Sequence, residues 1–155
     1  MAVLIFRPAD PPGIMVEVFS GTFNPLLVIV ILIGVFVAQT VAHELIHGIF
    51  IWVFIRQRPK FGFRGWYAFA AAPGWFFPSG QYLVIALAPL ILLSILGMVL
   101  VAVVPAGTLA AILFGIVANA AGAVGDMWIA FKVLRERRKI LIEDLGDGVN
   151  FYAPG

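Results

Sequence analysis

Three apolar segments constrain the fold most strongly, because each is long enough to cross a lipid bilayer as a helix. They span about residues 25–55, 82–104 and 108–131, and a membrane-spanning helix needs about 20 residues. The chain is 63% hydrophobic and only 12% charged, whereas a soluble domain is about one quarter charged. We therefore expect an all-α membrane protein with three transmembrane helices, folded as a single membrane-embedded domain over residues 1–155.

The basic residues predict how the helices are oriented. Four follow the first segment and five follow the third: Arg56, Arg58, Lys60 and Arg64, then Lys132, Arg135, Arg137, Arg138 and Lys139. Because lysine and arginine favour cytoplasmic loops, we expect a multi-pass protein of the cell membrane. Its connection at residues 56–80 and its C-terminus lie in the cytoplasm, and its N-terminus lies outside. We interpret these charges as contacts with lipid headgroups and expect no nucleic-acid partner.

One short motif places polar residues inside the first apolar segment. The sequence "HELIH" contributes His43, Glu44 and His47, which with Asp126 are the only ionisable residues within the three segments. Ionisable groups cost about 2.5–3.5 kcal/mol at mid-bilayer and usually serve function there. On a helix the two histidines project from one face and can bind one zinc ion, with the glutamate beside it as a general base.

Asp126 is the candidate for the third zinc ligand. A catalytic zinc normally has three protein ligands, and the chain has only two histidines and no cysteine. His47 and Asp126 lie at similar depths before the basic residues that follow their segments. The alternative is that Asp126 lies on a seam where two helices pack together and that it binds no metal. Three acidic residues of the tail are less favoured ligands: Glu143, Asp144 and Asp147.

Asn119 shares a helical stripe with Asp126 and two glycines, Gly115 and Gly122. Small residues along such a stripe let a neighbouring helix approach closely. We expect Asn119 either to support the metal ligands or contact the substrate, or to form an ordinary hydrogen bond between helices.

These motifs resemble the two halves of the active site in site-2 proteases, which are intramembrane zinc metalloproteases. The resemblance rests on "HELIH" and on "NAAGAVGD" at residues 119–126. It implies His43, His47 and Asp126 as ligands of one zinc ion and Glu44 as the base. Site-2 proteases usually carry glycine directly after this aspartate, where the chain has Met127. The chain is more similar to a small membrane family described as zincin peptidases.

The connection between the first two segments is aromatic, glycine-rich and basic over residues 56–80. One interpretation is an interfacial loop held by aromatic side chains at the headgroup level. The other is a β-hairpin that turns near Gly65 and offers a strand edge to an unwound substrate. Two further segments have strand-like patterns, residues 14–23 and the "VNFYA" that follows the turn signal "DLGDG".

Together these features predict an intramembrane zinc metalloendopeptidase that hydrolyses peptide bonds of membrane-protein or peptide substrates. The alternative is a non-catalytic metal-binding membrane protein, such as a sensor, a carrier or a degenerate protease acting as a binding module. Glu44 favours the enzyme, because a metal store needs no general base.

Overall fold

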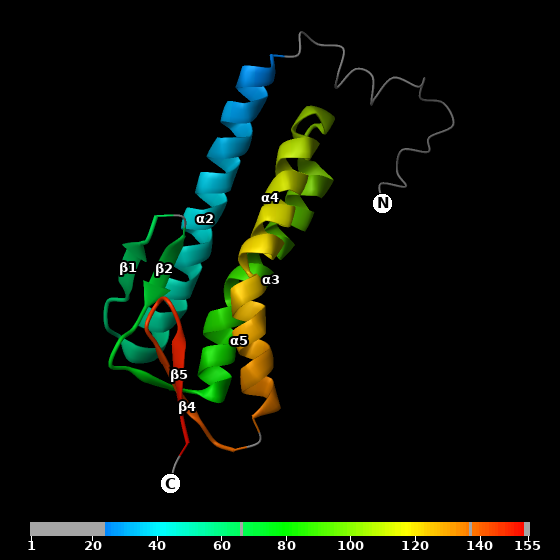
Figure 1. Ribbon diagram of the computed structural model, residues 1–155. Helices are drawn as coiled ribbons and strands as arrows, with labels where there is room; N and C mark the ends of the chain where they lie inside the picture. The colour runs from blue at the N-terminus through cyan, green and yellow to red at the C-terminus, as the bar shows by residue number, and fades with distance from the viewer. Residues whose placement is uncertain (1–23, 66, 137, 154–155) are drawn as a thin grey trace.

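The computed structural model describes residues 24–65, 67–136 and 138–153, which form four main helices and two small antiparallel sheets (Figure 1). Helix α2 spans Pro25–Ile55 and α3 spans Ser79–Val103. A 3-10 turn, η2 at Ala106–Thr108, then leads into α4 at Leu109–Gly122 and α5 at Val124–Arg135. The predicted strand at residues 14–23 lies outside the described residues.

Helix α2 has clear signals at both ends. The Asn24 side chain accepts hydrogen bonds from the N–H groups of Leu26 and Leu27, at 3.1 and 3.2 Å, and proline occupies the first turn. These are the features of a stable helix start. Arg56 ends the helix in a left-handed conformation and donates its N–H to the Trp52 carbonyl. The observed bounds match the predicted first segment.

The third predicted segment is a bent pair of helices, so the prediction of one helix over residues 108–131 is wrong. Helices α4 and α5 meet at Ala123 with a bend of 44°. Gly122 and Gly125 flank the break, and glycine lowers helix propensity on both sides of it. On length and composition, α2 and α3 can each span a membrane, and the bent pair adds a third span if it is counted as one.

Five short strands correct the expectation of an all-α protein. Strands β1 (Lys60–Phe63) and β2 (Ala68–Ala71) form a hairpin that turns at Gly65 with a positive φ, which agrees with the second of the two interpretations of residues 56–80. A second sheet has the order β3-β4-β5, from Phe76–Pro78, Leu141–Asp144 and Val149–Tyr152. Strand β5 falls within the predicted "VNFYA", but β3 and β4 pair across a long sequence separation and carry no local signal.

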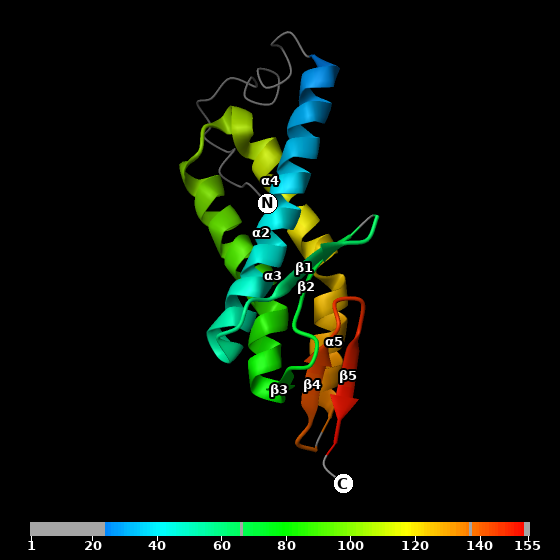
Figure 2. The ribbon, with the colours of Figure 1, turned by 90° about the vertical axis from the view of Figure 1, so that its left-hand side faces the viewer.

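The pairing of β3 with β4 joins the 56–80 connection to the C-terminal tail at one end of the helices. Figure 2 shows the start of α2 and the turn between α3 and α4 at the opposite end. The buried core lies where the two joined segments meet the helices and includes Ile51, Phe77 and Ile142. Farther along α2 and α3, most large apolar side chains face outward, as expected for helices surrounded by lipid.

The turn of the tail hairpin provides a test of this packing. Gly146 has φ +86°, and a Cβ atom added there would overlap the Phe69 ring of β2. We predict that Gly146→Ala costs about 1–3 kcal/mol through backbone strain alone and loosens the tail hairpin. Hydrogen exchange of residues 141–152 should report the loss of protection. Gly148→Ala is the matched control, because its added Cβ would meet open space; equal protection in both variants would contradict the packing.

Candidate metal centre

His43 and His47 lie one turn apart on the face of α2 that packs against the other helices. Both histidines are buried, and only 8% of the surface of each residue is exposed to solvent. Their rings meet edge to face, with centroids 4.9 Å apart. The i, i+4 spacing produces this arrangement, because such positions share one helix face.

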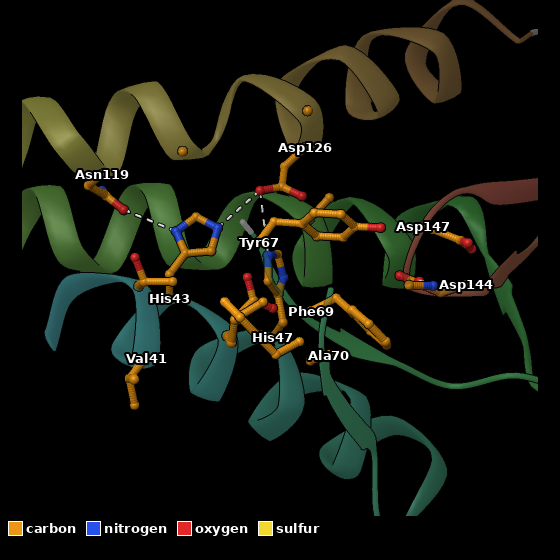
Figure 3. A pocket seen from close by; sticks show the side chains of 18 of the residues that line it. Val41, His43, His47, Tyr67, Phe69, Ala70, Asn119, Asp126, Asp144 and Asp147 are labelled. Atoms are coloured by element: carbon orange, nitrogen blue, oxygen red, sulfur yellow. Dashed lines mark hydrogen bonds and ion pairs between the residues drawn. The ribbon is translucent and has the colours of Figure 1, made fainter. Parts of the chain in front are cut away.

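Asp126 reaches the two imidazoles from the first turn of α5 (Figure 3). Its Oδ2 lies 3.1 Å from Nε2 of His43 and 3.5 Å from Nε2 of His47. The break at Ala123 has two effects on this carboxylate. It turns α5 relative to α4, and it places Asp126 near a helix N-terminus, where the dipole favours negative charge.

The hydrogen bonds behind the rings define which nitrogens carry protons. Nδ1 of His47 lies 2.8 Å from the Ile85 carbonyl oxygen, which can only accept, so Nδ1 is the donor. The Asn119 amide donates through Nδ2 to the Leu90 carbonyl, which turns its Oδ1 toward Nδ1 of His43 at 3.2 Å. Nδ1 of His43 must therefore donate as well. When both imidazoles are neutral, as metal ligands are, each presents an unprotonated Nε2 to Asp126.

Three acceptor atoms thus face one another in a buried space. Two imidazole lone pairs and a carboxylate oxygen repel unless a cation or additional protons lie between them. Ligands at about 2.0–2.1 Å from a tetrahedral zinc are separated by about 3.3–3.4 Å, close to the observed 3.1 and 3.5 Å. All three ligand atoms lie within 4.8 Å of one another. The donor set and its spacing fit one zinc ion.

Glu44 is half-buried beside His43 and lines the same pocket, which has a volume of about 860 Å³. The Ala70 N–H of β2 faces its carboxylate. Tyr67, Phe69 and Ala70 line this pocket with His47, as do Asp144 and Asp147 of the tail hairpin (Figure 3). The pocket therefore joins the two histidines to the edge of the β1–β2 hairpin and to the turn between β4 and β5.

Of the predicted site residues, His43, His47 and Asp126 are brought together and Asn119 contacts His43. The three less favoured acids lie outside this cluster. Glu143 accepts from the Gly74 N–H and the Tyr152 hydroxyl, and Asp147 pairs with Arg64 at 2.6 Å.

Asp144 is engaged in contacts within the pocket wall. It accepts from the Tyr82 hydroxyl at 2.9 Å and from the Gly146 N–H at 2.8 Å. Burial raises the pKa of the Asp144 carboxyl above its ordinary value, while these two donors act in the opposite direction. The contact of Ile85 with His47 was not predicted, because a backbone carbonyl carries no side-chain signal.

The fold and the cluster are those of a mostly helical protein with helices apolar enough to span a membrane and a histidine–carboxylate group that could hold a metal ion. Residues 35–141, more than two thirds of the chain, match the model of the family described as "Putative zincin peptidase". The chain belongs to this family, which links the cluster to zinc and to peptidase activity. No curated protein and no solved structure matches the chain significantly. The family match ends where β4 begins.

Removal of one ligand tests the metal centre. We predict that the purified parent binds one zinc ion per chain and that Asp126→Ala loses it, because only two imidazoles remain. Metal analysis after dialysis against a weak chelator measures the stoichiometry. Asp147→Ala, which removes an exposed carboxylate outside the cluster, should retain the ion. Full zinc occupancy in Asp126→Ala would exclude Asp126 as a ligand.

Proposed function

We propose that the protein is an intramembrane zinc metalloendopeptidase of the site-2 protease type, which hydrolyses peptide bonds of membrane-protein substrates. The observation that carries the proposal is the convergence of two imidazole nitrogens and one carboxylate oxygen within 4.8 Å of one another, with Glu44 on the same pocket wall. The family match supports the peptidase class. The apolar helices that carry the site support a substrate that arrives from the bilayer.

The residues have distinct roles in this reaction. His43, His47 and Asp126 would hold the zinc ion, and Glu44 would accept a proton from the attacking water and return it to the leaving nitrogen. Zinc, when bound, supplies Lewis acidity at the peptide carbonyl and lowers the pKa of water to about 7. Asn119 and the Ile85 carbonyl keep both imidazoles in the tautomer that a metal ligand requires.

The free edge of β2 would hold the substrate in an extended form. Arg64 donates its N–H to the Tyr67 carbonyl at 2.9 Å, so residues 64 and 67 form a hydrogen-bonded pair. Pairing alternates along an antiparallel ladder, so the backbone groups of Ala68 and Ala70 point away from β1. The Ala70 N–H faces Glu44, which places this edge beside the metal centre. A peptide added there would have its helical hydrogen bonds replaced by strand pairing.

The other end of the pocket suits an apolar substrate segment. It is lined by Phe36, Val37 and Val41 of α2, and by Ala118 and Gly122 of α4. The substrate would therefore place an apolar stretch between α2 and α4 and an extended stretch along β2. The basic residues around the two sheets support a cytoplasmic location for the end of the molecule that carries these sheets. The start of α2, at the opposite end of the molecule, would then lie outside.

Substitution of the general base tests the chemistry. We predict that Glu44→Gln retains one zinc ion but cleaves a membrane-protein substrate about 10²–10⁴-fold more slowly, the usual contribution of a general base. Glu136→Gln, an exposed glutamate after α5, is the control and should cleave like the parent. Equal cleavage by the Glu44→Gln variant and the parent would contradict the mechanism. Zinc binding by a parent that cleaves no substrate would instead favour the non-catalytic metal-binding alternative.

The strand edge can be tested by removing one backbone donor. Proline is tolerated on an edge strand where its missing N–H would point away from the ladder, so Ala68→Pro should preserve the hairpin. We predict a KM increase of roughly two- to tenfold, the effect of one lost hydrogen bond. Ala68→Val keeps the N–H and is the matched control. The same KM in both variants would show that substrate does not pair with this edge.

A further inference from the structure

The Ile85 carbonyl that accepts from His47 is also a carbonyl that its own helix leaves without the usual donor. In an α-helix each carbonyl accepts from the N–H group four residues later. For Ile85 that residue is Pro89, which has no N–H. Pro89 is the only proline in the interior of a described helix, and its ring is fully buried.

We propose that Pro89 is a positioning residue for the metal centre, because it frees the Ile85 carbonyl to hold His47. The cause is the missing donor, because the proline withholds the N–H that would otherwise compete for the Ile85 carbonyl. His47 Nδ1 occupies the freed position at 2.8 Å. The proposal deepens the proposed function and rests on His47 being a zinc ligand.

The energetics explain why such a contact would matter. A proline in a helix interior is strongly destabilising, in part because it leaves a carbonyl without its donor, which is especially unfavourable where water is excluded. The His47 N–H satisfies this carbonyl, while α3 continues without interruption from Ser79 to Val103. The Ile85 carbonyl, by accepting this hydrogen bond, keeps a proton on Nδ1 of His47, so that Nε2 of the same ring can bind a metal. Partners of this kind typically contribute 10–100-fold to metal affinity.

The chain is suited to a direct measurement, because it has only two histidines. With ¹⁵N-labelled histidine, the parent should show a protonated Nδ1 on each ring, and the Nδ1 proton of His47 should exchange slowly with water. In Pro89→Ala the new N–H competes for the Ile85 carbonyl. We expect faster exchange of that proton and about 10–100-fold weaker zinc binding in competition with a chelator.

A second variant separates the missing N–H from any effect of the proline ring on helix shape. Lactic acid, the hydroxy-acid analogue of alanine, can be placed at position 89 by nonsense suppression; it has neither the ring nor an N–H. If the freed carbonyl is the cause, this variant should show the parent's His47 signal and zinc affinity. If it behaves like Pro89→Ala, or if Pro89→Ala matches the parent, the proposal is overturned. Should Pro89→Ala fail to fold, the lactic acid variant alone decides by its His47 signal.

Pro105→Ala is the matched control, because Pro105 is exposed before η2 and far along the chain from the site. It should leave the His47 signal and the zinc affinity unchanged. The histidine spectrum is recorded on the metal-free protein as well, so it tests Pro89 even if the parent cleaves no substrate. Failure of the proposed function and failure of this inference are therefore distinguishable.

Discussion

The structure depends on one polar cluster inside the helix bundle, where Nε2 of His43 and Nε2 of His47 face a carboxylate oxygen of Asp126. When both imidazoles are neutral and carry their protons on Nδ1, all three of these atoms are hydrogen-bond acceptors. Such acceptors repel one another, most strongly where water is excluded. A divalent cation converts the repulsion into three favourable bonds. The contacts behind the rings serve this arrangement, since Asn119 and the Ile85 carbonyl prevent the imidazoles from turning their N–H groups toward Asp126.

In the proposed function, the two small sheets would give this buried centre a face for a polypeptide substrate. A peptide bond within a helix is shielded by its own hydrogen bonds, so hydrolysis requires an extended segment. Among the described strands, only β1 pairs with β2, which leaves the edge beside Glu44 without a partner strand. The tail hairpin packs against the same strand. Phe69 packs over Gly146, and Arg64 pairs with Asp147. The tail thus contributes to the pocket although it lies beyond the family match.

Much of this organisation follows from local sequence. The start of α2 is encoded by the Asn24 cap and the following proline, and the hairpin turn by Gly65. The spacing of His43 and His47 guarantees a shared helix face. The similar depth of Asp126 made it the candidate third ligand, and the structure brings it to the two histidines. The bounds of α2 and the proximity of Asp126 to the two histidines agree with the sequence, because they depend on a local signal or on rare polar residues in apolar segments. The role of Asp126 as a metal ligand stays a prediction.

Other features depend on contacts between distant segments, which only the folded chain specifies. Strands β3 and β4 are short and become strands only by pairing with each other, so no local periodicity predicted them. The bend at Ala123 was not predicted, because the hydropathy of an apolar segment is the same for a straight helix and for a bent pair of helices. The donor for the Ile85 carbonyl could not be inferred either, because it depends on how α2 packs against α3. The sequence therefore determined the chemical groups, whereas tertiary packing decided their tautomers, their distances and the strand edge beside them.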